Sequence, residues 1–314
     1  MKGVLCLGEA LIDFIPLDSE NLTYQKAPGG APANVAVGIS KLGGRAAFIG
    51  KVGDDVLGHF LKETLEGYGV DASPLVLTKE ARTGVTFVTL EPSGERSFSF
   101  YIDPSADRFL RKEELAPSLF KTNKIFHFGS ISLIGEPSRS ATLWAIEKAK
   151  EAGMLVSYDP NLRIGLWESE EQARETILSV LPYVDILKVS DVELSFLTGA
   201  ASLEEGLAKL REVPLTLLTL GGEGSIYSFN GITGKVPALR CKVVDTTGAG
   251  DAFVAGILYS INESPKTLTG HSEQEIREMV RFASVSGGLA TTKKGAMAGL
   301  PNLKELSGYL NTKN

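Results

Sequence analysis

Asp245-Thr246-Thr247-Gly248-Ala249-Gly250-Asp251 is the stretch that decides which fold this sequence favours. It follows a β-branched run, 241–244, and precedes an apolar run, 252–261. That order predicts a strand, a turn of small residues and then a helix. Glycines let the backbone approach a ligand closely, and the free N–H groups and dipole of a helix N-terminus favour an anion. The stretch therefore predicts an anion site with the Asp251 carboxylate at its mouth.

Two interpretations of Asp251 follow from this pattern. In the first, backbone N–H groups hold a phosphoryl group while the carboxylate takes a proton from an alcohol, which is what phosphoryl transfer to a hydroxyl requires. In the second, Asp251 only stabilises the first turn of a helix through the dipole. The seven residues leave both open, and the rest of the chain favours the first.

The composition excludes several classes of protein. The chain has 314 residues, 43% hydrophobic and 22% charged, which suits one large or two ordinary globular domains. Its net charge is −6, so the composition does not indicate a basic surface that binds nucleic acid. No apolar run is long enough to span a membrane. Cys6 and Cys241 lie in apolar runs and are predicted to be buried thiols in a reducing compartment. We therefore expect a cytoplasmic protein.

Short β-rich runs alternate with helical runs along most of the chain. This alternation predicts an α/β fold, a mainly parallel sheet with helices on both faces. The predicted strands are 4–7, 46–52, 125–128, 155–158, 186–189, 215–220 and 242–244. The predicted helices are 33–42, 56–68, 137–152, 170–180, 191–197, 203–210, 252–261, 273–291 and 303–310.

One segment interrupts the alternation. Residues 83–90 and 95–101 are two strand-like runs, and the Glu-Pro-Ser-Gly between them, 91–94, suits a type I turn. Residues 11–16 and 23–26 are further strands that could pair with this hairpin. A small β-sheet projecting from an α/β body predicts a lid over a ligand site. The alternative is a surface hairpin with no functional motion.

Two motifs near the N-terminus indicate a polar ligand. Asp13 is a carboxylate flanked by apolar residues, and two adjacent sugar hydroxyls would give it partners. Pro28-Gly29-Gly30-Ala31-Pro32-Ala33-Asn34 combines glycines, which let a ligand approach the backbone, with an amide that can donate and accept. The alternatives are an Asp satisfied by backbone N–H groups and a glycine turn that begins a helix.

Polar groups also follow three later strands, where ligands gather in open α/β sheets. Arg163, in Asp-Pro-Asn-Leu-Arg after the fourth strand, offers a fork for phosphate oxygens or else a surface ion pair. Glu193, five residues after Lys188, is either a group near magnesium-bound phosphate or a helix cap. The glycine turn 221–224 could seat nucleotide phosphates or be an ordinary tight turn.

Some signatures are absent from the sequence. It has no G-x-x-x-x-G-K-[ST] motif, which argues against a P-loop NTPase, and no G-x-G-x-x-G after the first strand, which argues against a nicotinamide oxidoreductase. No Cys and His residues have metal-ligand spacing. His127 is predicted to be a hydrogen-bonded residue at a strand end, not a catalyst.

Taken together, these segments resemble the PfkB/ribokinase family of carbohydrate kinases, and within it the fructokinases. The strings that carry the resemblance are P-G-G-A-P-A-N-V-A, A-R-T-G-V-T-F-V-T-L, D-P-S-A-D, D-P-N-L-R, K-V-S-D-V-E-L and D-T-T-G-A-G-D-A-F. The resemblance implies a ribokinase-like three-layer α/β/α body with a mainly parallel sheet and a small β-sheet lid. It also implies one kinase domain over 1–314, with the lid formed from about 11–27 and 83–103.

The resemblance further implies a role for each matching residue. Asp251 would be the base, with the anion hole at Gly248, Ala249 and Gly250 and support from Arg163. The sugar would bind to Asp13, Gly29, Gly30 and Asn34. ATP and its Mg²⁺ would meet Lys188, Glu193, Thr219, Gly221, Gly224 and Ser284. A potassium site would use Asp245, Thr247, Ala290, Lys293 and Gly295.

Four residues depart from the family's patterns. Ser190 and Ser284 stand where an Asn is usual, Gly299 replaces a Ser beside the cation site, and Asp103 replaces an Asn in the lid. These departures affect the expected contacts to magnesium, adenine, potassium and the sugar, in that order.

The function implied is ATP-dependent phosphorylation of the 6-hydroxyl of D-fructose. The alternative within the family is another acceptor, namely 2-keto-3-deoxygluconate, ribose or a nucleoside. A non-catalytic regulator with the same fold is disfavoured by the intact Gly-Ala-Gly-Asp. If Phe98, Phe100 and Tyr101 expose an apolar face of the lid, a homodimer through the lids is expected.

Overall fold

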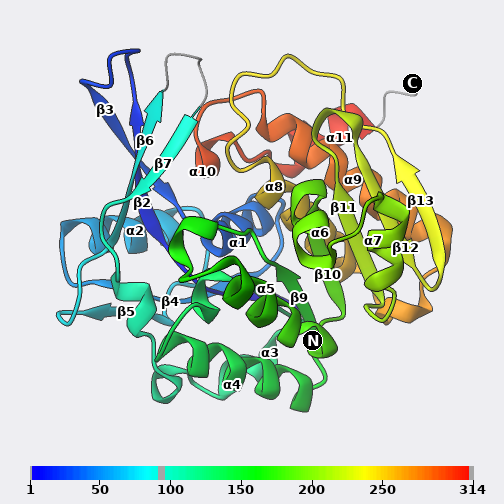
Figure 1. Ribbon diagram of the computed structural model, residues 1–314, viewed down its shortest axis with the longest axis horizontal. Coiled ribbons are helices and arrows are strands. Elements are labelled where there is room, and N and C mark those ends of the chain that lie inside the picture. Colours follow the sequence, from blue (N-terminus) through cyan, green and yellow to red (C-terminus); the bar gives the residue numbers. More distant parts are fainter. Residues whose placement is uncertain (1, 91–95, 311–314) are drawn as a thin grey trace.

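A large central sheet with helices on both faces forms the body of the molecule, and a small sheet projects from it (Figure 1). The computed structural model describes residues 2–90 and 96–310. The central sheet has the order β13-β12-β11-β10-β9-β8-β1-β4-β5 and is parallel except at β12 and β13. Its strands are β1 Val4–Leu7, β4 Ala46–Gly53, β5 Leu75–Thr78, β8 Ile125–Gly129, β9 Leu155–Asp159, β10 Ile186–Ser190, β11 Leu215–Thr219, β12 Ser225–Phe229 and β13 Ile232–Val236.

The helices divide between the two faces of this sheet, so the predicted three-layer α/β/α body is confirmed. On one face lie α1 Ala31–Lys41, α2 Val56–Gly67, α8 Ala249–Glu263 and α9 Glu273–Ala290. On the other lie α3 Ser118–Thr122, α4 Ser138–Glu151, α5 Glu170–Ser179, α6 Asp191–Thr198 and α7 Leu203–Lys209. Two further helices, α10 Ala296–Gly299 and α11 Leu303–Leu310, follow α9.

Strand β1 shows why the sheet is covered on both sides. All four of its residues are buried, with Val4 and Cys6 in one hydrophobic cluster and Leu5 and Leu7 in the other. Successive side chains of a strand point to opposite faces, so a strand buried on both faces is apolar throughout. This continuous apolar pattern, with helices between the strands, made the parallel sheet predictable.

The small sheet has the order β3-β2-β6-β7 and stands above the body beside α10 (Figure 1). Its strands are β2 Leu11–Pro16, β3 Tyr24–Gly29, β6 Gly84–Leu90 and β7 Arg96–Phe100, which confirms the four predicted runs. The predicted type I turn at 91–94 lies outside the described residues. Strands β2 and β6, which lie far apart in the sequence, pair in parallel. The β2–β3 and β6–β7 pairs are antiparallel.

The two faces of the small sheet differ. Phe98 and Phe100 share one face, as predicted, and both line a cavity between this sheet and the body. On the other face the ring of Phe87 stacks on Phe14 at 5.1 Å between centroids and meets Tyr101 edge-on at 5.5 Å. Tyr101 is 73% exposed. The homodimer through the lids stays a prediction, which a sedimentation measurement would test.

The prediction of a strand at 242–244 is wrong. These residues form no regular structure, and the side chains of Val243 and Val244 are about half exposed. β-branched residues favour a strand only where a neighbouring strand can pair with them, and the sheet already ends at β13. The backbone is held instead by the Val244 N–H, which donates to the Thr291 carbonyl at 2.7 Å.

Two smaller expectations also changed. Strands β5, β12 and β13 were not predicted; β5 has only one fully buried residue, and exposed side chains interrupt the apolar pattern in β13. Cys6 is buried as expected, but Cys241 is only half-buried because its segment lies on the surface of the body. None of the described helices is both long and apolar enough to cross a membrane.

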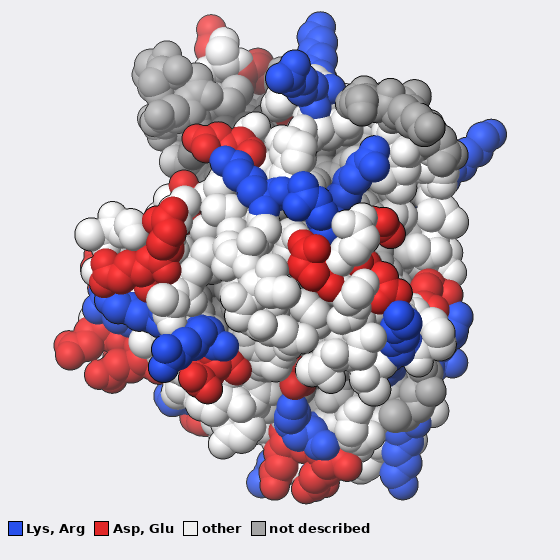
Figure 2. Space-filling model, turned by 90° about the vertical axis from the view of Figure 1, so that its right-hand side faces the viewer, with Lys and Arg blue, Asp and Glu red and all other residues white. Residues whose placement is uncertain are grey.

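Basic and acidic side chains are mixed on the face shown in Figure 2. A short row of Lys and Arg in the upper half of that view is bordered by Asp and Glu. This face therefore offers no broad basic surface of the kind that nucleic-acid backbones require.

Candidate active site

Two cavities lie on either side of the start of α8. The first, of about 360 Å³, lies beneath the small sheet and is lined by Asp13, Asn34, Arg163 and Asp251 among others. The second, of about 530 Å³, lies between the 238–243 segment and α9. Both are lined by Thr246 and Gly250. A ligand in one cavity can therefore meet a ligand in the other at this turn.

The turn between the cavities has the geometry of an anion site. Gly248 precedes α8 with φ of 79°, a left-handed conformation that glycine adopts without strain. The Ala249 N–H donates to the Thr246 carbonyl, and no described side chain caps the helix. The next N–H groups have no partner within the helix and remain available to a ligand. Helix α8 begins three residues earlier than predicted, which places Asp251 in its first turn.

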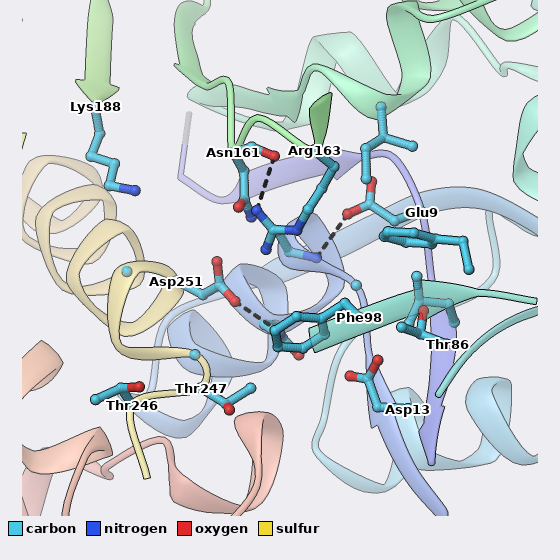
Figure 3. Close-up of a pocket in the computed structure, with 18 residues that line it drawn as sticks. Glu9, Asp13, Thr86, Phe98, Asn161, Arg163, Lys188, Thr246, Thr247 and Asp251 are labelled. Carbon is cyan, nitrogen blue, oxygen red and sulfur yellow. Dashed lines mark hydrogen bonds between the residues drawn. The ribbon is translucent and has the colours of Figure 1, made fainter. Parts of the chain in front are cut away.

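Asp251 is buried and held by one neighbour. Its Oδ2 accepts a 2.7 Å hydrogen bond from Nδ2 of Asn34, which projects from α1 (Figure 3). Burial raises the pKa of Asp251, and the Asn34 amide and the charges of Lys188 and Arg163 only partly offset it. The carboxylate is thus more basic than usual, as a general base should be.

A buried cation lies beside the anion site. The Lys188 ammonium contacts Oδ2 of Asp159 at 3.0 Å, and both side chains are almost fully buried. A Cβ added to Gly250 would lie 3.2 Å from Lys188 Nζ, so the missing side chain at Gly250 leaves that space open. Burial opposes ionisation of Lys188, but the charges of Asp159 and Glu193 outweigh it and raise its pKa. Lys188 is therefore a fixed positive charge that lines the first cavity next to Gly250.

Glu193 holds the loop that carries Arg163. Its Oε1 accepts from the Leu162 N–H at 2.8 Å, while its Oε2 accepts from the backbone and hydroxyl of Ser190. The bond from the Ser190 N–H, together with the Glu193 N–H donating to Ser190 Oγ at 3.2 Å, forms a capping box at the start of α6. Burial opposes ionisation, but Lys188 and these donors outweigh it and lower the pKa of Glu193. Both the cap and the contact to the loop are therefore real, and Arg163 lines the first cavity from that loop.

Asp13 and Gly30 line the first cavity, and Gly29 lies against the Asp13 carboxylate without lining the cavity itself. A Cβ at Gly29 would overlap the Asp13 carboxylate, and one at Gly30 would overlap the Glu9 carbonyl. Gly30 also has a φ of 102°, so both positions need glycine. Burial raises the pKa of Asp13 to about 7, with Arg163 lowering it and Asp251 raising it further. These glycines leave the carboxylate open to the cavity.

Three buried polar atoms around this cavity have no partner among the residues that the structure describes. They are Oε2 of Glu9, Oδ1 of Asn34 and Oγ1 of Thr86. Buried polar atoms are normally hydrogen-bonded, and exceptions call for an explanation such as a missing ligand. Several such atoms around one cavity suit a small molecule with many hydroxyl groups.

The second cavity is larger and more apolar. Thr219, Gly221 and Gly224 line it from the end of β11 and the turn after it, and Ser284 lines it from α9. The hydroxyl of Ser284 is hydrogen-bonded to that of Ser225 at 3.2 Å. Phe253 and Leu239 supply apolar walls, and the cavity is wide enough for a purine nucleoside with its phosphates directed at the shared turn.

The predicted cation-site residues also come together. Asp245 is buried and accepts from the N–H groups of Thr247 and Gly295, each at 3.0 Å. A Cβ added to Gly299 would lie 3.0 Å from the Ala290 carbonyl oxygen and 3.6 Å from that of Lys293. A Ser at this position would therefore crowd the Ala290 carbonyl while making only ordinary contact with that of Lys293. In the described part of the chain, no cluster of three His, Cys, Asp or Glu side chains suits a metal.

Comparison with known proteins identifies the family. The family model for pfkB family carbohydrate kinases matches residues 1–303. The chain belongs to this family. It is 49% identical to "Probable fructokinase-2" of Arabidopsis thaliana, over 98% of this chain and 96% of that protein. It is a sugar kinase.

Two solved structures of pfkB family members share its fold. One is a fructokinase double mutant of Vibrio cholerae O395 in a fructose-, ADP- and potassium-bound form, with 41% identity, a TM-score of 0.91 and 99% of each chain covered. The other is an aminoimidazole riboside kinase of Salmonella enterica with aminoimidazole riboside and an ATP analogue. It is 34% identical with a TM-score of 0.88, over 99% of this chain and 100% of that chain.

Within this pfkB chain, the predicted residues sort by cavity. Asp13, Gly30, Asn34, Arg163, Lys188, Gly248 and Asp251 line the first, and Thr219, Gly221, Gly224, Ala249 and Ser284 line the second. Glu193 lines neither and acts through the loop at 162. His127 lies within β8 and donates to or accepts from Ser157 Oγ at 3.0 Å, so it is hydrogen-bonded as predicted.

Sequence reasoning missed Glu9 and Thr86. Glu9 lies two residues after the end of β1 and is a charged residue in an apolar segment, the same signal that singled out Asp13. Thr86 lies on the same face of the hairpin as Phe100 and pairs with it across the sheet. Alternation alone did not show which face of the hairpin meets the ligand.

The raised pKa of Asp13 predicts how stability changes with pH. A carboxyl with a raised folded-state pKa contributes stability that is fully present below its unfolded value, near 4, and is lost as pH rises through about 7. Between pH 5.0 and 8.5 the melting temperature of the ligand-free protein should therefore fall less in Asp13→Asn than in the wild type. Thermal denaturation across this range measures it, and parallel curves would contradict it.

Proposed function

We propose that the chain transfers the γ-phosphoryl group of ATP to the 6-hydroxyl of D-fructose. The observation that carries the proposal is the turn at 246–251, which lines both cavities and places a buried carboxylate beside free N–H groups. The sugar would occupy the cavity beneath the small sheet and the nucleotide the other one. The V. cholerae fructokinase, solved with fructose and ADP, supports this choice of substrates.

Each residue of the turn has a distinct part in this proposal. Asp251 takes the proton of the attacking hydroxyl, and its position is set by the Asn34 amide. The N–H groups at Gly250 and Asp251 stabilise charge on the phosphoryl group, together with Lys188. Asp13, Gly29 and Gly30 hold the sugar, and Arg163 approaches its reacting end. Thr219, Gly221, Gly224 and Ser284 hold the nucleotide.

The residues present also fit the two cations. Mg²⁺ prefers phosphate oxygens, water and few carboxylates, and Asp159 and Glu193 are the acidic groups near Lys188 that would hold its water. A potassium ion suits the carbonyls of Ala290 and Lys293 near Asp245, and the V. cholerae structure contains potassium. Each ion would supply positive charge at or behind the anion site.

We further propose that residues 1–314 act as one kinase unit, with 11–27 and 83–103 as its lid. Phe98 (Figure 3) and Phe100 line the first cavity from that sheet. Closure of such a sheet would exclude water, which otherwise competes with the sugar as acceptor.

A coupled ADP-release assay tests the acceptor. With ATP and Mg²⁺, the purified protein should have a kcat/KM for fructose at least about 10-fold higher than its kcat/KM for ribose, 2-keto-3-deoxygluconate or nucleosides. A 10-fold ratio corresponds to a free-energy difference of about 1.4 kcal/mol. The 6-position is checked by coupling the product to glucose-6-phosphate isomerase and dehydrogenase. Adding potassium in place of sodium should raise the rate. Higher activity with a nucleoside would overturn the assignment of fructose.

The nucleoside alternative has one specific support, the 34% identical aminoimidazole riboside kinase. An aglycone base would need a wide apolar region at the far end of the sugar cavity. The described residues there include Glu9, Asp13 and Thr86, whose polar side chains interrupt the apolar surface of Leu11, Phe100 and Ile131. These polar groups favour a free sugar.

A further inference from the structure

Glu9 has the surroundings of a ligand-binding group and no assigned role. It follows β1, is 4% exposed, and lines the sugar cavity. Its Oε1 accepts from the Ala31 N–H at 2.9 Å, at the start of α1. Its Oε2 is buried with no partner among the described residues. A helix cap alone would use one oxygen and would not explain why the second is buried beside a cavity.

A small annex opens from the sugar cavity at Glu9. It has a volume of about 20 Å³, enough for one water-sized group, and shares Glu9, Leu11, Phe100 and Ile131 with the main cavity. Its other walls include Asp107 and Arg108, and the Nε of Arg108 is a second buried atom without a described partner. The annex therefore suits a single hydroxyl group carried on a short arm.

Figure 3 places Glu9 and Asp251 on opposite sides of the cavity, with Arg163 between them. If the 6-hydroxyl of a fructofuranose meets Asp251, the carbon on the other side of the ring oxygen is C2. That carbon carries the C1 hydroxymethyl group, a primary hydroxyl on a one-carbon arm. Ribose has no such arm at its anomeric carbon.

We propose that Glu9 is a specificity-determining residue that binds the C1 hydroxyl of the ketohexose through Oε2. This inference rests on the proposed function and identifies the feature of the sugar that the cavity selects. Because Oε1 accepts from Ala31, a proton on Glu9 resides on Oε2, which then donates to the sugar oxygen. Burial, and to a lesser degree the charge of Asp107, raises the pKa of Glu9 to about 8, so the donor form predominates at pH 7.

The test combines a change in Glu9 with a change in the sugar. The KM for D-fructose and for 1-deoxy-D-fructose, which lacks only the C1 hydroxyl, is measured for the wild type and for Glu9→Met. Loss of one hydrogen bond to a buried polar group should raise the fructose KM of Glu9→Met about 10- to 100-fold, with a smaller change in kcat. The wild type should lose a similar factor with 1-deoxyfructose, and Glu9→Met should treat the two sugars alike.

Two further variants separate binding from structure. Glu9→Gln keeps an acceptor for Ala31 and an N–H donor for the sugar, so it should recover most of the lost affinity for fructose. Thr216→Val is the matched control, because Thr216 is also buried with an unpartnered hydroxyl but lines neither the cavities nor the annex described above. Its KM for both sugars should equal that of the wild type.

Each result bears on a separate claim. If wild-type protein does not phosphorylate fructose, the proposed function fails and this inference fails with it. If it does, but Glu9→Met raises KM equally for both sugars, Glu9 is only a helix cap and the inference alone is overturned. Should Glu9→Met not fold, the wild-type comparison decides, and equal KM values for the two sugars would overturn the inference.

Discussion

Asp251→Asn is expected to lower kcat about 10³-fold, within the 10²- to 10⁴-fold range typical of a lost general base, while sugar and ATP still bind. An asparagine fills the same space and can still pair with Asn34, but it cannot accept the proton of the attacking hydroxyl. The dissociation constants for fructose and a non-hydrolysable ATP analogue should change less than about 5-fold, or 1 kcal/mol. Steady-state kinetics and calorimetric titration measure both quantities.

The control for this variant is another aspartate in the first turn of a helix. Asp191 begins α6, is exposed, and is not among the residues that line the two cavities. Asp191→Asn should lose only the stabilisation that a negative charge gives to a helix N-terminus, about 0.3–1 kcal/mol. Its turnover should be normal. If Asp251→Asn behaves the same way, Asp251 is structural and the proposed mechanism is wrong.

Lys188→Met is expected to have the second large effect, on stability and on turnover together. Removing one partner of a buried pair leaves Asp159 as an uncompensated charge, a loss of about 3–5 kcal/mol. For a chain of this size that should lower the melting temperature by roughly 10 °C. Turnover should fall at least about 100-fold, as it does when a group that stabilises the transition state is removed.

A double-mutant cycle separates the two roles of Lys188. In Asp159→Asn/Lys188→Met the buried charge is gone, so most of the melting temperature should return. The turnover of the double variant should stay far below that of Asp159→Asn alone, because the phosphoryl group still lacks its cation. Recovery of turnover in step with stability would show that Lys188 serves only to neutralise Asp159.

Much of the site could be predicted because its residues stand in local patterns. Gly248, Ala249 and Gly250 form a turn of small residues before a helix, and the structure places that turn between two cavities. Asp13 stood out as a charge in an apolar strand, and it faces the first cavity. Both signals arise within a few residues, so one sequence was enough to find them.

Other features depended on partners far along the chain. The 242–244 segment has strand-forming residues but no adjacent strand, so it follows the surface and contacts Thr291 instead. Glu193 was expected to be either a helix cap or a group near phosphate, and its oxygens both cap α6 at residue 190 and hold residue 162. The local sequence pattern determines neither the path of 242–244 nor the contacts of Glu193, because both depend on which distant groups the fold brings within hydrogen-bonding distance.

Most of the order of strands and helices, the four strands of the small sheet and the small-residue turn before α8 were determined by the sequence alone, through the spacing of apolar residues and the conformations that glycine permits. The tertiary structure decided which face of the small sheet meets the ligand, and that Asn34 reaches Asp251 from 217 positions away. It also decided that Glu9 buries an oxygen beside an annex of the first cavity. The physical reason is that hydrogen bonding and desolvation act over a few ångströms in space, whatever the separation along the chain.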